Sequence, residues 1–295
     1  MAQLSKRLAE NVDGNFYVDS TCIDCDLCRQ MAPRVYARSD EEEQSYVRRQ
    51  PANRVDAHRA MMALVACPTA SIGTARKISA VEAARSFPEV IEGEVSFCGY
   101  AAESSFGASS YFIQRPRGNV LVDSPRDAGP LMRRLEQAGG VRWMFLSHRD
   151  DVADHRAYAR RFGCERVLHR DDASRGTSDV ERLLEGGEPV RLDDDLLVIP
   201  VPGHTRGSAA LLYREEFLFT GDHLWATDEQ DALEMSRGVC WYSWREQLSS
   251  LEKLLSFQFR WVLPGHGRRF FAETPARMHE AIRALLADVS TQRAV

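Results

Sequence analysis

Four apolar, strand-like runs between residues 141 and 266 each lead to a histidine or an aspartate. His148 follows VRWMFLS, His204 follows LLVIPV and a Pro-Gly pair, Asp222 follows EFLFT and a glycine, and His266 follows WVL and a second Pro-Gly pair. Active residues of α/β folds gather at the carboxyl ends of strands, and glycine there lets the backbone crowd around a centre. A single strand-end histidine is commonly structural, but four such ends in order predict one shared site.

The first strand end continues into a cluster of polar residues. Asp150 and Asp151 lie just beyond His148, and Asp154 and His155 begin the next predicted helix. Aspartates are expected at a helix N-terminus as caps and dipole partners. That role accounts for the aspartates but not for two histidines, so the cluster predicts a metal site.

Apolar periodicity and glycine or proline breaks predict the other elements. Strands that alternate with helices indicate a layered α/β architecture. Helices are expected at 55–65, 128–140, about 151–162, 244–257 and 274–289, and strands at 109–114, 119–125, 141–147, 165–169, 189–192, 196–201, 208–214, 216–220 and 260–265.

A cysteine motif near the N-terminus predicts a different centre. CIDCDLC contains Cys22, Cys25 and Cys28, a spacing that lets three thiolates from one loop bind three corners of a 4Fe–4S cluster. Cys67, which Pro68 follows, is the expected fourth ligand. A zinc site would need two paired CxxC units or histidines at set spacing, and a disulfide framework is unusual inside the cell.

Length and charge limit the other possibilities. The 295 residues, 44% of them hydrophobic, suffice for a large core and a small satellite domain, and the net charge of −5 does not favour nucleic-acid binding. No apolar run suits a membrane span or a secretory signal, so we expect a cytoplasmic protein without membrane contact. The predicted division is a small domain at 1–78, a linker at 79–93 and a large domain at 94–295. Cys98, Cys164 and Cys240 are expected to be small buried hydrophobes.

The small domain resembles the single-cluster bacterial ferredoxins, from CIDCDLCRQMAPRVY through to ACPTASIG. Met31 or Ala32 stands where a two-cluster ferredoxin has a further cysteine. The resemblance implies an α+β ferredoxin-like fold with one 4Fe–4S cluster, which carries one electron at low potential and exchanges it with a redox partner protein.

The large domain resembles the metallo-β-lactamase superfamily, whose motifs H-x-H-x-D-H, PGHT-x-GS, GD and PGHG occur in the same order. The resemblance implies an αββα sandwich with two divalent metal ions at one edge. This chain departs from the family at the second histidine, where Asp150 is the candidate ligand and Asp151 the fallback. A carboxylate there favours iron or manganese relative to zinc. Carried over, His148 and His204 bind the first metal, Asp154, His155 and His266 bind the second, and Asp222 bridges them.

PGHTRGS and GDH are most like the glyoxalase II branch, so the resemblance implies hydrolysis of an ester, thioester or related bond of a small-molecule substrate. Asp154 is the candidate catalytic residue, because it could orient the attacking water. A glutathione thioester is not expected, since only about 25 residues follow PGHG where glyoxalase II has a helical domain. The alternative is a non-haem iron oxidoreductase, similar to flavodiiron proteins or persulfide dioxygenases, that receives electrons from the ferredoxin domain. A third interpretation is a docking module with a redox-sensing cluster.

Other side chains receive milder predictions. His169 is expected near a ligand or at the surface, and His223 is expected to point away from the site, because neighbours on an extended chain face opposite sides. Trp241, Tyr242 and Trp244 could line a substrate pocket or anchor a helix to a sheet.

Overall fold

The computed structural model describes residues 1–291. Its contacts divide the chain into two compact units, which we call unit 1 (residues 1–142 and 153–163) and unit 2 (residues 143–152 and those from 164 onward). The predicted domain limits at 78 and 94 both fall within unit 1. They stay a prediction about the chain's modular organisation.

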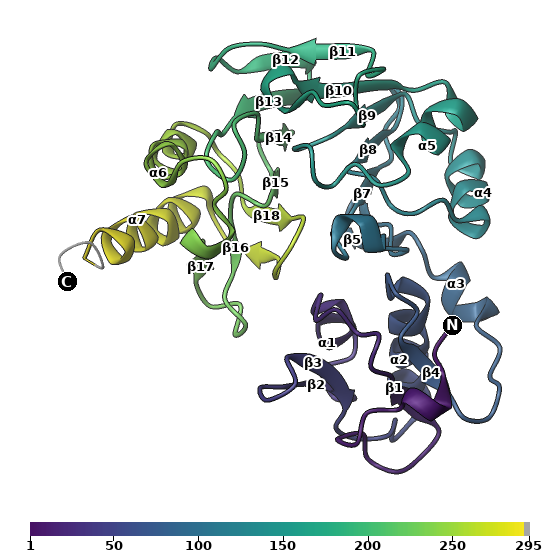
Figure 1. The fold of residues 1–295 in the computed structure, drawn as a ribbon. Helices are drawn as coiled ribbons and strands as arrows, with labels where there is room; N and C mark the ends of the chain where they lie inside the picture. The colour runs from purple at the N-terminus through teal and green to yellow at the C-terminus, as the bar shows by residue number, and fades with distance from the viewer. Residues whose placement is uncertain (292–295) are drawn as a thin grey trace. The chain divides into compact units, whose positions relative to one another are not determined.

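The N-terminal part of unit 1, which contains Cys22, Cys25, Cys28 and Cys67, folds into two short sheets and two α-helices (Figure 1). The helix predicted at 55–65 is confirmed, and it begins after Asn53, whose side chain accepts a hydrogen bond from the backbone N–H of Asp56. Strands β1 and β4 pair antiparallel, as do β2 and β3. The elements are β1 (Phe16–Val18), α1 (Leu27–Met31), β2 (Tyr36–Ser39), β3 (Gln44–Val47), α2 (Arg54–Ala66) and β4 (Ile72–Thr74).

The rest of unit 1 is an antiparallel ladder of four strands with three helices. The predicted hairpin around RPRG is confirmed as β7 and β8. The expected linker is not a plain connector, because Ala83 and Phe87 are buried and the segment folds as a helix and a strand. The elements are α3 (Val81–Arg85), β5 (Glu89–Glu92), β6 (Val95–Phe97), β7 (Tyr111–Ile113), β8 (Val120–Val122), α4 (Gly129–Gln137) and α5 (His155–Phe162).

Unit 2 begins with three parallel strands and continues into a second sheet. The parallel strands are β9 (Trp143–Phe145), β10 (Glu165–His169) and β11 (Arg182–Leu184). The second sheet has the order β12-β13-β14-β15-β18-β19, in which only β15 and β18 pair in parallel. Its strands are β12 (Val190–Asp193), β13 (Leu196–Pro200), β14 (Ala209–Tyr213), β15 (Phe217–Gly221), β18 (Trp261–Pro264) and β19 (Phe270–Phe271).

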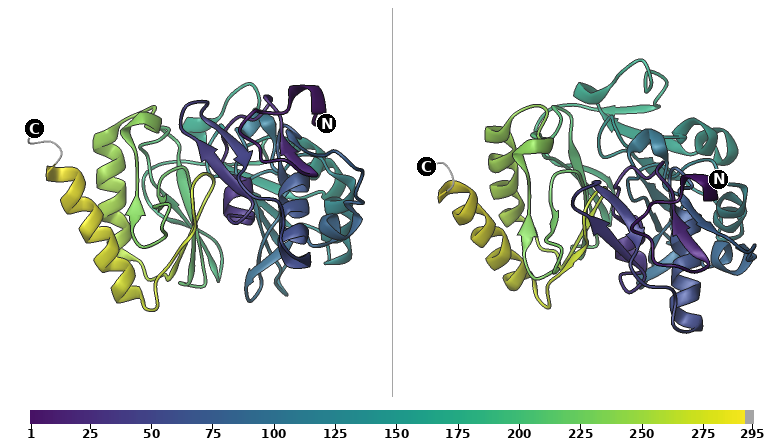
Figure 2. Two further views of the ribbon diagram at one scale, coloured as in Figure 1. Left: turned by 90° about the horizontal axis from the view of Figure 1, so that it is seen from below. Right: turned by 60° about the horizontal axis from the view of Figure 1, so that its bottom comes forward.

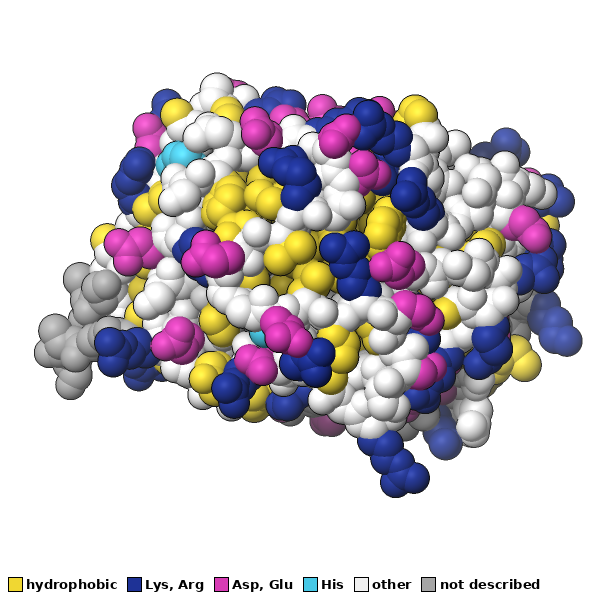
Figure 3. Space-filling model, turned by 90° about the horizontal axis from the view of Figure 1, so that it is seen from above, with side chains coloured by type: hydrophobic (Ala, Val, Ile, Leu, Met, Phe, Trp, Pro, Cys, Tyr) yellow, Lys and Arg dark blue, Asp and Glu magenta, His cyan; other side chains and the backbone are white. Residues whose placement is uncertain are grey.

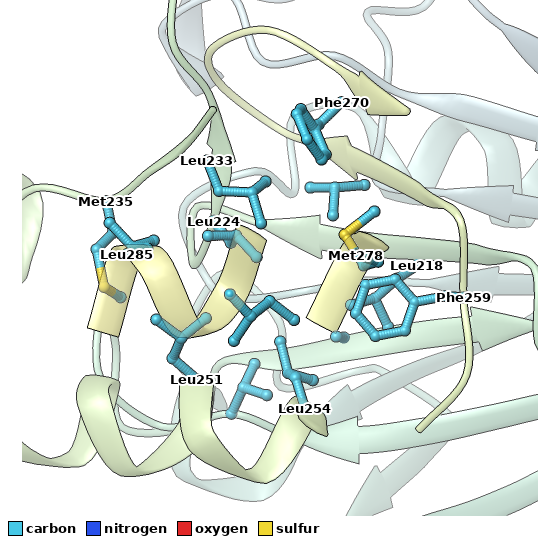
Figure 4. Close-up of a cluster of buried hydrophobic side chains, with 14 of the residues drawn as sticks. Leu218, Leu224, Leu233, Met235, Leu251, Leu254, Phe259, Phe270, Met278 and Leu285 are labelled. Carbon is cyan, nitrogen blue, oxygen red and sulfur yellow. The ribbon is translucent and has the colours of Figure 1, made fainter. Parts of the chain in front are cut away.

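Two helices cover one face of the second sheet and form the core of unit 2 with it (Figure 2). They are α6 (Trp244–Lys253), which Ser243 caps, and α7 (Pro275–Thr291). A small hairpin of β16 (Trp225–Ala226) and β17 (Leu233–Glu234) packs nearby. Figure 4 shows the buried side chains that these elements bring together, including Leu218, Leu224, Leu233, Leu251, Leu254, Phe259, Met278 and Leu285.

The surface charge is mixed, as the small net charge of the sequence suggests. On the face shown in Figure 3, Lys and Arg side chains are intermingled with Asp and Glu side chains. Within residues 1–291, no helix has both the length and the apolar character that crossing a membrane requires.

Candidate metal centre

Two parallel strands place Asp222 and His266 side by side. Gly221, at the end of β15, pairs with Pro264 of β18, and the Gly265 N–H donates to the Gly221 carbonyl at 2.9 Å. His266 Nδ1 consequently lies 2.8 and 2.9 Å from the two carboxylate oxygens of Asp222. A Cβ atom on Gly265 would come within 2.8 Å of an oxygen of Asp222, so a side chain at this turn would crowd the site.

His148, beyond β9, and His204, beyond β13, face the same carboxylate. Their Nε2 atoms lie 3.8 and 3.7 Å from Asp222 Oδ2. Both Nε2 atoms are buried and make no hydrogen bond to any residue that the structure describes. His204 Nδ1 contacts the carbonyl of Val239, which can only accept, so Nδ1 carries the proton and Nε2 keeps its lone pair. The geometry suits metal binding through Nε2.

Asp150 and Asp151 contribute to different sides of this cluster. Asp150 is half-exposed, and its Oδ2 lies 3.8 Å from His204 Nε2. Asp151 is only 1% exposed, and its Oδ2 lies 4.0 Å from both His148 Nε2 and His266 Nδ1. The sequence treated these two aspartates as alternatives, whereas the structure brings both to the cluster.

The electrostatics of the cluster favour the forms that bind cations. Burial lowers the pKa of His148 to about 4, so its imidazole is neutral at neutral pH. Burial acts to raise the pKa of Asp222, but His266, His148 and His204 outweigh it and hold that pKa well below its usual range. The ligands are therefore a neutral imidazole and an ionised carboxylate, as metal binding requires.

Two overlapping ligand groups arise from these residues. Ligand atoms of His148, Asp150 and His204 lie within 4.8 Å of one another, and so do those of His148, Asp151 and Asp222. Imidazole and carboxylate donors suit zinc, iron and manganese. The buried, unbonded Nε2 atoms of His148 and His204 are the observation that best fits a bound ion.

Asp154 and His155 belong to unit 1 and lie at the start of α5. This helix begins at His155 rather than near residue 151, so Asp151 lies in the preceding loop instead of a helical turn. Asp154 is exposed, and its Oδ2 accepts a hydrogen bond from the backbone N–H of Asp127 at 2.6 Å. His155 is buried. Their roles as ligands, and the catalytic role of Asp154, stay predictions.

Sequence reasoning missed Asp172, which holds two ligand loops together. Its buried carboxylate accepts hydrogen bonds from the Arg149 N–H at 3.0 Å, the Thr205 hydroxyl at 2.5 Å and the Gly207 N–H at 2.8 Å. Arg149 lies next to His148, and Thr205 lies next to His204. The sequence offered one signal, an aspartate shortly after a predicted strand, but its partners are far away in the chain.

We expect Asp172→Ala to weaken metal binding in unit 2 by about 10–100-fold, the usual effect of losing a residue that supports metal ligands. The substitution leaves two backbone N–H groups without their acceptor and frees both ligand loops. Metal affinity measured by competition with a chelator checks this expectation. Asp171→Ala is the matched control, because the neighbouring Asp171 side chain is partly exposed and pairs with Arg206. Equal affinities for the two variants would contradict the role.

The remaining predictions have mixed outcomes. His169 Nε2 donates a hydrogen bond to the Gly186 carbonyl, and its Nδ1 accepts one from the Asp171 N–H. The side chain therefore supports the loop around Gly186. His223 is fully buried, and its ring nitrogens make no hydrogen bond to the described residues. Trp244 packs against the core of unit 2, as an anchor does. Trp241 is 62% exposed, with its ring centre 6.2 Å from that of His204, and Tyr242 is also exposed.

The four cysteines of the N-terminal motif line one cavity in unit 1, together with apolar side chains. The Sγ atoms of Cys22 and Cys67 accept hydrogen bonds from the N–H groups of Ser45 and Ser71 at 3.4 and 3.3 Å. Burial raises the pKa of Cys25 to about 12 and that of Cys28 well above its usual value. Four converging sulfurs with backbone donors fit a 4Fe–4S cluster, whose binding would release the thiol protons.

The scattered cysteines follow their prediction in two cases. Cys98 and Cys164 are buried, whereas Cys240 is partly exposed and its thiol donates to the Gly203 carbonyl. The expectation of burial is therefore wrong for Cys240. Its thiol has a backbone partner at the edge of the His204 loop and is held there by that bond.

Comparison with known proteins finds similar proteins and one matching family. Residues 18–74 match the family described as the 4Fe-4S single cluster domain of Ferredoxin I. A hydroxyacylglutathione hydrolase of Anaeromyxobacter dehalogenans is 38% identical over 128 residues, which are 41% of this chain and 49% of that protein. The chain thus spans about half the length of this relative. A hydroxyacylglutathione hydrolase of Rhodospirillum rubrum is 28% identical over 61% of this chain and 71% of its own.

A solved structure shows the fold. The B3 metallo-β-lactamase BLEG-1 superposes with a TM-score of 0.50 at 20% identity, covering 65% of this chain and 99% of that one. The predicted fold class is confirmed. Residues 18–74 thus match a 4Fe–4S single-cluster ferredoxin family, and the chain contains a metallo-β-lactamase fold. The chain is also similar in sequence to hydroxyacylglutathione hydrolases.

Proposed function

We propose that the metallo-β-lactamase-fold region is a metal-dependent hydrolase that cleaves an ester, a thioester or a related bond. The observation that carries this proposal is the convergence of His148, His204, Asp222 and His266, with Asp150 and Asp151, on one cluster of ligand atoms. The similarity to proteins named hydroxyacylglutathione hydrolase supports hydrolysis, with thioesters as the first substrates to test.

The residues of unit 2 have different roles in such a reaction. Two divalent ions, when bound, lower the pKa of a water towards neutrality and stabilise the oxyanion that forms. His148 and His204 offer neutral Nε2 atoms as ligands, and Asp222 faces both of them. Asp151 Oδ2, buried between His148 and His266, is the carboxylate best placed in unit 2 to orient the attacking water. This assigns to Asp151 the task that the sequence suggested for Asp154.

Trp241 and Tyr242 offer an exposed aromatic surface beside this centre. The N–H groups of both residues donate to the His204 carbonyl, at 2.9 and 3.1 Å, so they are tied to a ligand loop. Exposed aromatic rings held in this way can pack against an apolar acyl or thiol group. They thus favour a substrate with an apolar part near the scissile bond.

A second candidate function is a non-haem iron oxidoreductase supplied with electrons by the ferredoxin domain. The observation that favours it is the group of His148, Asp150 and His204, which is a set of two histidines and one carboxylate. Non-haem iron enzymes use that donor set. The presence of a ferredoxin domain in the same chain also points to redox chemistry.

Metal content and activity, measured after anaerobic purification, separate these proposals. About four irons with about two zincs per chain, and hydrolysis of acyl thioesters, are expected for the hydrolase. About six irons without zinc, and no hydrolysis of esters or thioesters, would overturn it and favour the oxidoreductase. S-acylglutathione is assayed beside smaller thioesters. The experiment therefore also tests the prediction that a glutathione thioester is not the substrate.

The proposal extends to compartment and partners. A cluster motif of cysteines suits a reducing compartment, which supports a cytoplasmic location as part of the proposal. A small molecule is the proposed substrate. A redox protein that exchanges single electrons with the cluster is the proposed partner, and neither nucleic acid nor a membrane is expected to bind.

A further inference from the structure

The environment of the cysteine motif includes residues from beyond the ferredoxin match. Gly107, which has a φ of +87°, lies so close to the motif that a Cβ atom there would be 2.5 Å from Cys25 Cβ and 3.3 Å from Pro68 Cγ. The Ala101 N–H donates to the carbonyl of Ala66, one residue before Cys67. The matched family ends at residue 74. The segment around 101–107 therefore packs directly on the loops that hold the four sulfurs.

Arg126 makes the most specific of these contacts. Its guanidinium donates to the carbonyl of the ligand Cys67 at 3.1 Å, to that of Ala101 at 2.6 Å and to that of Val65 at 2.5 Å. Its Cζ atom lies 5.4 Å from the centre of the Tyr100 ring. A permanent cation is thus partly buried on the backbone of a cluster ligand, and a guanidinium keeps its charge throughout the usual pH range.

The backbone of Arg126 is held from both sides. Its N–H donates to the Tyr100 carbonyl at 2.9 Å, and its carbonyl accepts from the Tyr158 hydroxyl at 2.8 Å. The next residue, Asp127, donates its N–H to Asp154. These bonds hold the Arg126 backbone, and the three carbonyl groups hold its guanidinium. The positive charge is therefore already in position when an electron reaches the cluster, and the side chain does not have to move.

We propose that Arg126 is a positioning residue of the iron–sulfur site that raises the reduction potential of the cluster. Reduction transfers one electron from a low-potential one-electron donor to the oxidised cluster, and no bond forms or breaks. The site becomes more negative by one charge, and a cation fixed beside it stabilises the reduced form. The part of the chain beyond the ferredoxin domain thereby takes part in setting the potential of the cluster.

The test compares midpoint potentials of the full, cluster-loaded chain and its variants in anaerobic titrations with mediator dyes. Arg126→Gln keeps a hydrogen-bond donor but removes the charge, and it is expected to lower the potential. Arg126→Lys keeps the charge and is expected to stay close to the unmodified protein. Arg134→Gln removes an exposed cation on α4, in the same unit but without a contact to the cysteine loops among the described residues, and it is expected to leave the potential unchanged.

An unchanged or higher potential in Arg126→Gln would overturn the proposal, as would equal shifts in the Gln and Lys variants. If Arg126→Gln does not retain the cluster, Arg126→His allows the same comparison in a single variant, because the imidazole is charged at low pH and neutral at higher pH. Its potential should fall relative to that of the unmodified protein as pH rises through the imidazole range, and a constant difference would overturn the proposal. An unmodified chain without any cluster would overturn the iron–sulfur assignment too, whereas hydrolysis is not part of the readout.

Discussion

Asp222→Ala is expected to remove metal from unit 2 and to lower hydrolysis by about a thousandfold, since metal ions contribute several kcal/mol to stabilising the transition state. Asp222 touches more of the cluster than any other carboxylate described here, because His148, His204 and His266 all face it. Its loss removes an anionic ligand and also the hydrogen-bond partner of His266. Metal analysis of the purified variant and the rate of thioester hydrolysis measure the two effects.

The same variant should keep its brown colour, because the cysteine motif lies in unit 1 and shares no ligand with this centre. Asp228→Asn is the matched control. Asp228 also belongs to unit 2, but its side chain is 82% exposed and pairs with Arg268 at the surface. Full metal content in Asp222→Ala would show that the cluster of ligand atoms is not a metal centre. Loss of both centres would contradict their independence.

Cys67→Ala is expected to abolish the 4Fe–4S cluster while leaving the metals of unit 2 in place. A cubane cluster held by four thiolates loses one corner, and no other cysteine is among the residues that line the cavity with Cys22, Cys25 and Cys28. Desolvation raises the pKa of each remaining thiol, Cys22, Cys25 and Cys28, so without iron they stay protonated. Visible absorbance and iron content per chain measure the loss.

Cys240→Ser is the control for this experiment. Cys240 donates to the Gly203 carbonyl, which a serine hydroxyl can also do, and it lies in unit 2. That variant should retain the colour and the iron of the unmodified protein. If Cys67→Ala instead kept four irons per chain, the fourth ligand would have to be a different residue.

The elements that position the site were largely predictable, because their signals are local. The strands that lead to His148, His204, Asp222 and His266 appear at 143–145, 196–200, 217–221 and 261–264, close to their predicted limits. Apolar runs that end in glycine or proline carry this information within a few residues. The cysteine spacing was equally informative, since one tight loop must present three of its sulfurs.

The choice among the carboxylates was not predictable in the same way. Asp150, Asp151 and Asp154 lie within five positions of one another, and nothing in their order shows which of them becomes buried. The turn between β9 and α5 makes that choice, and it buries Asp151 against Gly265 while leaving Asp154 exposed. Gly221 at the end of β15 and Gly265 just after β18, both more than 60 positions away, lie against that turn.

Residue types, their spacing and their periodicity thus sufficed to predict the fold class and to name candidate ligands at two sites, since each of these signals depends on neighbours along the chain. Three assignments needed the folded chain: Asp151 among the ligands, Asp172 between the ligand loops and Arg126 on the backbone of Cys67. Asp172 and Arg126 depend on hydrogen bonds to residues more than 20 positions away, and Asp151 depends on burial beside His266. No local pattern encodes such contacts.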